Sequence, residues 1–469
     1  MDFKVRQEVI SFLNDFEAKH PTEQWLAEGV KVWPILKTSL FLRLAWGDKG
    51  FHKQNFDRSE LVDSVYRTAK RIRSSSWLKG VELKSANYLF FSGVNFREKF
   101  NGESFNKFYD PIGDELEGKG KKFIFLEYGS TAQENTYKNR VKNIQLIYHY
   151  FENRVKIAEI DYSKWNGIVE LISFFQSRLS CSSLSVYEKI RDTLRKVFIW
   201  KASFDWILDQ TKPQKIFLLS YYNFPCFGLL IAARRRGIAC VDIQHGPQGV
   251  LHVAYSGFKE DYAILPTSFW LWDSKSEEQL KDNLNFSTFQ TTVGGNPWHY
   301  FLMNKSNELN QKKPSILFTL QPVNPIIDEY VIDTILRTKD EYAWLIRLHP
   351  RIDTTSKGGL IEKLKILGIF DKGLWDLANE TPLPLLLKEV DLHISKFSGC
   401  ISEAADIGTF SIILEHVGEI TFKHLLKEQI AIGGIDFNSE NLLSAIHANI
   451  GKKKAVDSVD LELVVDQLC

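Results

Sequence analysis

The sequence predicts two α/β domains, each built on a parallel sheet, with a helical extension at the N-terminus. The chain has 469 residues, which is more than one ordinary hydrophobic core accommodates. Short apolar runs without polar alternation, typical of buried parallel strands, recur along it between helix-like segments. A polar stretch at residues 305–313 interrupts this pattern. We therefore predict an extension at 1–85, a first domain at 86–300 and a second domain at 301–469.

The composition is that of a globular protein, and it favours neither nucleic-acid binding nor metal binding. Hydrophobic residues make up 44% and charged residues 25%, and the formal net charge is +1, so no basic excess favours nucleic acid. The five cysteines are scattered and lack a CxxC pair, which argues against disulfides and zinc and suits a reducing compartment. We expect no metal, no cofactor and a cytoplasmic location, with peripheral attachment at the inner face of the plasma membrane as the alternative.

The first half of the chain alternates strands and helices. Residues 1–85 are predicted to be mostly helical, because apolar residues recur there at helical spacing. Residues 95–114 are predicted to be a polar loop, and residues 137–206 are predicted to be helical again. A helix at 227–236 is expected to end at Gly237, since glycine is favoured just after a helix. The strands of this half are expected at 88–93, 123–129, 215–220 and 238–243.

The second half repeats this alternation after the polar stretch. Each predicted strand is an apolar run, and the segments between them have helical periodicity. The strands are expected at 316–320, 344–348, 390–394 and 411–415, and the helices at 326–338, 360–368, 383–389 and 403–408.

The stretch 391–408 resembles an anion site. A strand ends there in small residues, Ser395, Ser398 and Gly399, and leads into a helix. The free N–H groups and the dipole of a helix N-terminus favour phosphate. Glu403 lies one turn into that helix, where its carboxylate accepts hydrogen bonds from ribose hydroxyls. The alternative is an ordinary connection whose serines only cap the helix.

His349 follows a predicted strand and is flanked by Arg347 and Arg351. Ligands of open α/β sheets bind at the carboxyl ends of strands, so these cations are candidates for binding phosphate. The alternative is a structural histidine before a turn proline.

Gln244, His245 and Gly246 end a strand of the first half. His245 has the side-chain chemistry of a general base near neutral pH, and the glycine lets a ligand approach the backbone. A packing histidine is the alternative. Glu98, Asp110 and Glu127 are also candidate bases, although we expect solvated surface acids at these positions.

The segments VDLHISKFSGCISEAADIG and WLIRLHPR resemble the nucleotide-binding half of GT-B glycosyltransferases, in particular bacterial enzymes that build capsule and lipopolysaccharide. VDIQHG resembles a strand end in the acceptor half of capsule transferases and of polyol-phosphate polymerases. The likeness covers roughly residues 215–435. It implies two Rossmann-like domains that face each other across a cleft, with a nucleotide-sugar donor bound to the second. CMP-linked sugars are among the candidate donors.

The resemblance also implies residue roles. His349 contacts the donor phosphates, Ser395 and Ser398 bind phosphate, and Glu403 holds the ribose. His245 is the base or an acceptor contact, and the acceptor is a glycan or lipid-linked glycan of a surface polysaccharide. Lys396 and Phe397 interrupt what is often a tighter Ser/Thr pair, so the serine that meets phosphate stays open.

Hexosyl, sialyl and Kdo transfer are equally compatible with these motifs. A polyol-phosphate transferase of the CDP-glycerol type, a nucleotide-sugar epimerase or hydrolase, and a non-catalytic scaffold are the alternative functions.

Overall fold

The computed structural model describes residues 3–46, 74–76, 78, 80–129, 135–179, 182–246, 248–249, 252–259, 262–284, 288–303, 313–455 and 460–468. The chain divides into two compact units: Met1–Pro297 with Asp460–Cys469, and Trp298–Val459. Each unit contains one parallel sheet covered by helices, so the predicted fold class of two α/β domains is confirmed. The cleft between the two domains stays a prediction.

The N-terminal extension is helical where it is described. Helix α1 (Phe3–Lys19) and helix α2 (Trp33–Trp46) flank a small antiparallel pair, β1 (Leu26–Ala27) and β2 (Val30–Lys31). Their apolar faces are buried around Trp25 and Trp33, whose rings contact edge to face at 5.5 Å. The extension therefore joins the hydrophobic core of the first unit.

The first sheet has seven parallel strands in the order β11-β10-β9-β8-β3-β6-β7. In chain order they are β3 (Tyr88–Gly93), β6 (Phe123–Tyr128), β7 (Val141–Asn143), β8 (Lys215–Leu219), β9 (Ala239–Ile243), β10 (Ser268–Leu271) and β11 (Gln290–Val293). Buried Phe91 pairs with Leu126 on one side and Leu218 on the other. The strand order reverses direction between β3 and β8, which makes that edge the topological switch point.

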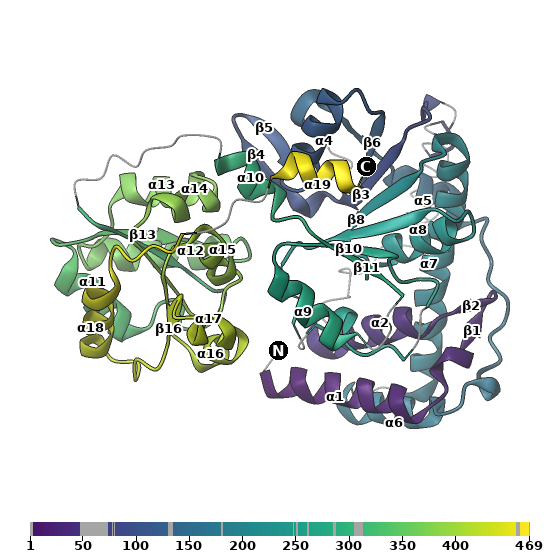
Figure 1. The fold of residues 1–469 in the computed structure, drawn as a ribbon. Coiled ribbons are helices and arrows are strands. Elements are labelled where there is room, and N and C mark those ends of the chain that lie inside the picture. The colour runs from purple at the N-terminus through teal and green to yellow at the C-terminus, as the bar shows by residue number, and fades with distance from the viewer. Residues whose placement is uncertain are drawn as a thin grey trace. The chain divides into compact units, whose positions relative to one another are not determined.

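The first unit also contains helices outside the extension. They are α4 (Tyr109–Gly118), α5 (Gln145–Glu152), α6 (Ile168–Leu179), α7 (Ser183–Thr211), α8 (Phe224–Arg234), α9 (Ser274–Asn283) and α19 (Leu461–Leu468). We expected the C-terminal residues in the second domain, but α19 packs beside α4, as Figure 1 shows in yellow and blue. Lys119 of α4 pairs with Glu462 and Asp466 of α19.

The predicted loop at residues 95–114 was wrong. It contains an antiparallel hairpin, β4 (Arg97–Phe100) with β5 (Glu103–Asn106), and the start of α4. Asn101 and Gly102 both have positive φ, at 49° and 81°, which is the conformation that favours an Asn-Gly hairpin turn. The predicted helix at 137–206 is likewise interrupted by β7 and by an irregular segment before α6.

The second sheet has five parallel strands in the order β13-β12-β14-β15-β16. They are β12 (Ser315–Thr319), β13 (Ala343–Arg347), β14 (Leu392–Ser395), β15 (Ser411–Ile413) and β16 (Ala431–Ile432). The helices are α10 (Pro297–Met303), α11 (Glu329–Thr338), α12 (Thr354–Ile366), α13 (Lys372–Glu380), α14 (Leu383–Glu389), α15 (Cys400–Ile407), α16 (His416–Thr421), α17 (Lys423–Lys427) and α18 (Ser439–Asn449). This strand order places the switch point between β12 and β14. In the described part of the chain, no helix has both the length and the apolar character that spanning a membrane requires.

Candidate functional site

A chain of buried hydrogen bonds lies at the switch point of the second sheet. Ser395 ends β14 with 0% of its surface exposed, and its hydroxyl donates to the carbonyl of Thr319 at 3.0 Å. Thr319 donates to Ser395 at 2.9 Å and accepts from His393 Nε2 at 2.9 Å, while Ser411 lies 2.9 Å from His393 Nδ1. Burial lowers the pKa of His393 to about 3, so this histidine is neutral. The hydroxyl of Ser395 thus joins neighbouring strands and does not face a ligand.

Lys396 fixes the loop that follows Ser395. It is 2% exposed, and its Nζ lies 2.9 Å from Asp328 and 3.4 Å from Glu415. It also donates to the carbonyl of Pro325 at 3.1 Å. These partners belong to the loops that follow β12 and β15, so one buried cation holds three loops at the switch point. Lys396, which interrupts the expected Ser/Thr pair, therefore holds together the loops at this edge of the sheet.

Ser398 and Gly399 directly precede helix α15. The Ser398 hydroxyl accepts from the Cys400 N–H at 3.3 Å and donates to Cys400 Sγ at 3.1 Å. Its backbone carbonyl accepts from the Ile401 N–H at 3.0 Å. Only 7% of Ser398 is exposed, while Gly399 is half-buried. The Ser398 hydroxyl is thus hydrogen-bonded to Cys400 at the start of α15, and its phosphate role stays a prediction.

Glu403 lies one turn into α15 with 26% of its side chain exposed. His299 of α10 places its Nε2 3.5 Å from the Glu403 carboxylate, and both residues belong to the second unit. We did not identify His299 from the sequence. The sequence contains a signal nearby, because this histidine directly follows the run Gly-Asn-Pro-Trp at residues 295–298.

His349 lies in the loop after β13 and is half-buried. Its Nδ1 accepts a hydrogen bond from the Arg351 N–H at 3.0 Å, so Nε2 carries the proton and is the donor. Partial burial and the nearby Arg351 lower the pKa of His349, which keeps the ring neutral. Since β13 and β14 both neighbour β12, His349 and Ser398 emerge at the same edge of the sheet.

The two arginines beside His349 have different surroundings. Arg347 donates to the carbonyls of Ala378 and Thr381 at 2.7 and 2.6 Å, where α13 ends. This guanidinium therefore braces the strand against a helix C-terminus, as the helix dipole favours. Arg351 is exposed.

His245 lies at the switch point of the first sheet. Its Nδ1 is 3.4 Å from the Ile243 carbonyl, which accepts only, so Nδ1 carries the proton. The free lone pair of Nε2 then accepts from Ser220 at 2.9 Å and from Tyr222 at 3.1 Å. Burial lowers the pKa of His245 to about 4. The residue is thus a neutral imidazole with two hydroxyl donors at its basic nitrogen.

Gln244 and Gly246 have different positions beside this base. Gln244 is 3% exposed, and its amide accepts from the Trp272 N–H at 2.8 Å and donates to Ser276 at 3.1 Å. Its side chain joins the ends of β9 and β10, so its amide is hydrogen-bonded within the protein. A methyl group added to Gly246 would meet nothing within 4 Å, so space is open next to His245.

Buried tyrosines hold the loop that follows His245. Asp242 is 0% exposed and accepts from Tyr255 at 2.7 Å and from the Tyr221 N–H at 3.1 Å. The Tyr221 hydroxyl donates in turn to the carbonyl of Ala254. Burial raises the pKa of Asp242 from 3.8 to about 7.

The N-terminal helices hold the same loop from outside. Lys37 of α2 is 0% exposed, pairs with Glu17 of α1 at 2.8 Å and donates to the Ser256 carbonyl at 2.9 Å. Glu17 also accepts from the Lys259 N–H at 2.9 Å. Gly257 has φ +80°, and a methyl group there would collide with Lys37 Nζ, so glycine is required. The extension thereby positions the segment next to the candidate base.

The expectation of solvated acids was wrong for Asp110 and Glu127, which are 1% and 0% exposed. Glu127 pairs with Arg97 at 2.5 Å. Asp110 accepts from the Asn106 N–H at 2.7 Å, and Asn106 accepts from the Tyr109 N–H at 3.1 Å. This reciprocal cap begins α4 and explains the burial of Asp110. Glu98 is partly exposed and lies 3.7 Å from Lys107.

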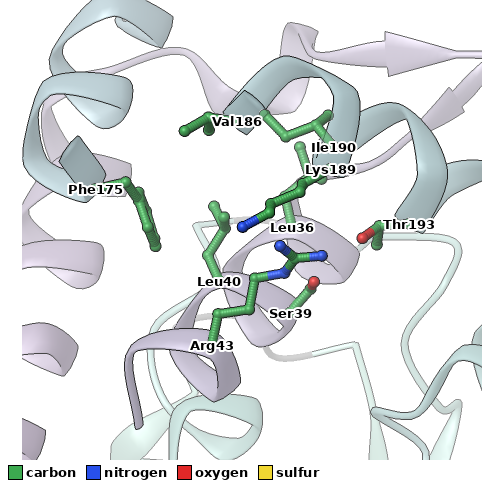
Figure 2. Close-up of a pocket in the computed structure, with 9 residues that line it drawn as sticks. All are labelled: Leu36, Ser39, Leu40, Arg43, Phe175, Val186, Lys189, Ile190 and Thr193. Atoms are coloured by element: carbon green, nitrogen blue, oxygen red, sulfur yellow. The ribbon is translucent and has the colours of Figure 1, made fainter. Parts of the chain in front are cut away.

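A hollow lies between α2, α6 and α7 of the first unit. Figure 2 shows the Arg43 guanidinium and the Lys189 ammonium pointing into it among apolar side chains. It contains none of the residues singled out from the sequence. Among the described residues, no group of three or more His, Cys, Asp or Glu side chains is arranged to hold a metal ion.

No family model matches the chain, and no curated protein matches it significantly. Among solved structures, the UDP-GlcNAc 2-epimerase from Methanocaldococcus jannaschii is similar at 13% identity, with a TM-score of 0.48 over 81% of this chain and 99% of that chain. A putative UDP-N-acetylglucosamine 2-epimerase from Listeria monocytogenes has 10% identity and a TM-score of 0.46, over 83% and 95%. The wall teichoic acid polymerase TagF has 9% identity and a TM-score of 0.43, over 86% and 96%. Likenesses at this distance do not establish an activity for this chain.

Proposed function

We propose that the chain is a GT-B glycosyltransferase that moves a sugar from a nucleotide-linked donor onto a glycan or lipid-linked glycan acceptor of a surface polysaccharide, with CMP-linked sugars among the candidate donors. One observation carries the proposal. At the switch point between β12 and β14, the loop held by Lys396 leads into the N-terminus of α15, and Glu403 lies one turn later. Open α/β sheets bind ligands at such a point, and a helix N-terminus favours phosphate.

The second unit is proposed to bind the donor. The Nε2–H of His349 donates to a phosphate oxygen, and Ser398 and Gly399 present the start of α15 to the same group. Glu403, oriented by His299, accepts hydrogen bonds from the ribose hydroxyls. Arg351 adds an exposed positive charge beside His349.

Two of the predicted binding residues change role in this proposal. Ser395 is completely buried, and its hydroxyl is used within the sheet. Arg347 is bonded to the end of α13. Both are assigned here to positioning the edge, and the phosphate contact of the stretch is assigned to Ser398.

The first unit is proposed to supply the base. His245 Nε2 takes the proton of the acceptor hydroxyl while the acceptor oxygen bonds to the sugar carbon and the bond from that carbon to the phosphate oxygen breaks. The neutral ring is ready to accept that proton, and the acceptor hydroxyl takes the place of Ser220 or Tyr222 at Nε2. The departing phosphate is stabilised by the dipole of α15 and by His349.

Thermal unfolding in the presence of CMP, CDP, UDP and GDP tests the donor site first. A nucleotide that binds only the folded chain raises the melting temperature, and the shift should disappear in Ser398→Ala together with His349→Ala. No shift with any of the four nucleotides would refute the proposal and favour a non-catalytic scaffold.

Incubation with matching donors then separates the activities. Sugar transfer that needs an acceptor supports the proposal. Turnover of a CDP-polyol instead identifies a polyol-phosphate transferase, and conversion of the donor without any acceptor identifies an epimerase or hydrolase. Addition of liposomes to the transfer assay tests peripheral membrane attachment and the use of a lipid-linked acceptor.

A further inference from the structure

Gln248 is buried without a hydrogen-bond partner. It is 4% exposed, and neither the oxygen nor the nitrogen of its amide finds a partner in the described part of the chain. In the same loop, Nδ1 of His252 is also buried and has no partner among the described residues. Buried polar groups in native proteins are nearly always bonded, so two such groups four residues apart call for an explanation.

The loop that contains them lies beside the candidate base. It follows His245, and the ring of His252 is 4.8 Å from the ring of Tyr222, whose hydroxyl is 3.1 Å from His245 Nε2. A methyl group added to Gly246 or Gly249 would meet nothing within 4 Å, so the loop borders open space. The unpartnered groups therefore belong to the same sheet edge as the base.

The far end of this loop is held firmly. Tyr255 is bonded to buried Asp242 at 2.7 Å, and the Ser256 carbonyl accepts from buried Lys37 at 2.9 Å. These contacts fix the backbone at residues 255–256, three residues after His252. Groups that are held in place before a ligand arrives bind it with less loss of conformational entropy.

We propose that Gln248 and His252 form a subsite that recognises hydroxyl groups of the acceptor sugar. The proposal rests on the proposed transferase function and adds the residues that select the acceptor. An amide offers a donor and an acceptor side by side, which matches two neighbouring sugar hydroxyls, and a neutral imidazole nitrogen adds a third contact. The ligand then completes the hydrogen bonds that the free protein leaves unmade.

Replacement of Gln248 by leucine separates a ligand site from a structural role. In the free protein the leucine removes an unpaired buried amide, so the melting temperature should rise by a few degrees. With acceptor present, KM for the acceptor should rise by roughly tenfold or more, while kcat and the nucleotide-induced thermal shift change little. A lower melting temperature with unchanged KM would overturn the proposal. A higher melting temperature with unchanged KM would do so as well, since the amide then binds an ordered water only.

Gln145→Leu is the matched control. Its amide oxygen accepts from the Gly129 N–H at 3.1 Å, so the same substitution should lower the melting temperature and leave acceptor KM unchanged. His252→Leu provides a second variant with the same expectation as Gln248→Leu if the latter fails to fold.

Binding of simple sugars distinguishes failure of this proposal from failure of the transferase function. A panel of methyl glycosides at millimolar concentration should raise the melting temperature of the unaltered chain and not that of Gln248→Leu. If the glycosides protect the chain but no nucleotide does, the subsite stands and the transferase function falls. If nucleotides protect it and no glycoside does, the subsite is refuted.

Discussion

The pair of Lys37 and Glu17 offers the sharpest test of how the extension holds the functional loop. Lys37→Met keeps most of the side-chain volume and removes only the ammonium. The variant leaves the Glu17 carboxylate, 3% exposed, without its cation and leaves the Ser256 carbonyl without its donor. The ammonium also lies 4.5 Å from the ring centre of Phe258, and that attraction is lost too.

The expected loss follows from the burial of both partners. Removal of one partner from a buried ion pair costs about 3–5 kcal/mol, because the other charge stays buried and unpaired. For a unit of this size, each kcal/mol lowers the melting temperature by about 2–4 °C, so a decrease of about 10 °C is expected. Burial lowers the pKa of Lys37 even though Glu17 opposes this change. Desolvation of the ammonium therefore outweighs its attraction to the carboxylate.

A second substitution tests that explanation directly. Glu17→Gln keeps an oxygen that accepts from the Lys259 N–H and removes the uncompensated charge. The double variant should recover about half or more of the loss, roughly 2 kcal/mol, as a double-mutant cycle in urea would measure. A loss below about 1 kcal/mol for Lys37→Met, or no recovery in the double variant, would refute the reasoning. Because the loop that follows His245 loses an anchor in Lys37→Met, KM for the acceptor should also rise. Assays on the same preparations would measure this change.

Four further outcomes are expected. His349→Ala should lower the transfer rate by roughly tenfold or more without lowering the melting temperature, as initial rates beside thermal unfolding would show. Because the pKa of His245 is about 4, this base is unprotonated from about pH 5.5 to 8, and kcat/KM should be flat over that range; an acid limb centred near pH 6.5 would contradict this. Burial raises the pKa of Asp242 from 3.8 to about 7, so the folded chain holds a proton that the unfolded chain releases, and stability falls as pH rises between those values; Asp242→Asn should flatten this decline in urea midpoints. Lys396→Met should cost about 2 kcal/mol in urea, since the carboxylates of Asp328 and Glu415, which are 25% and 34% exposed, lose their cation; no measurable loss would contradict a role of Lys396 in holding these loops.

Local sequence patterns predicted the secondary structure correctly where the residues of a segment determine its own conformation. The apolar run at 88–93 is β3 as predicted, and the helix at 383–389 is α14. Strand β3 is buried along its length and α14 from Leu383 to Leu387, and continuous hydrophobicity is the signal that such burial leaves in a sequence. The hairpin of β4 and β5 was missed, although its Asn-Gly turn was readable, because the surrounding residues are mostly polar.

The sequence also predicted which residues lie at the carboxyl edge of each sheet, because these residues directly follow the predicted strands. The sequence placed His245, His349 and Ser398 directly after strands, and each lies at the carboxyl edge of its own sheet. What an edge residue bonds to depends on its neighbours in space. Arg347 and Ser395 were assigned to phosphate from the sequence, yet their partners come from α13 and β12, which lie elsewhere in the chain.

By itself, the sequence determined the two parallel α/β units, the helical extension and the strand ends at which chemistry is expected, since periodicity and apolar runs act over a few residues. Only the tertiary structure decided that Lys396 joins three loops, that Lys37 of the extension reaches the loop beside His245, and that the amide of Gln248 is buried without a partner. These features depend on which distant segments meet and on how much water they exclude, and no local pattern records either quantity.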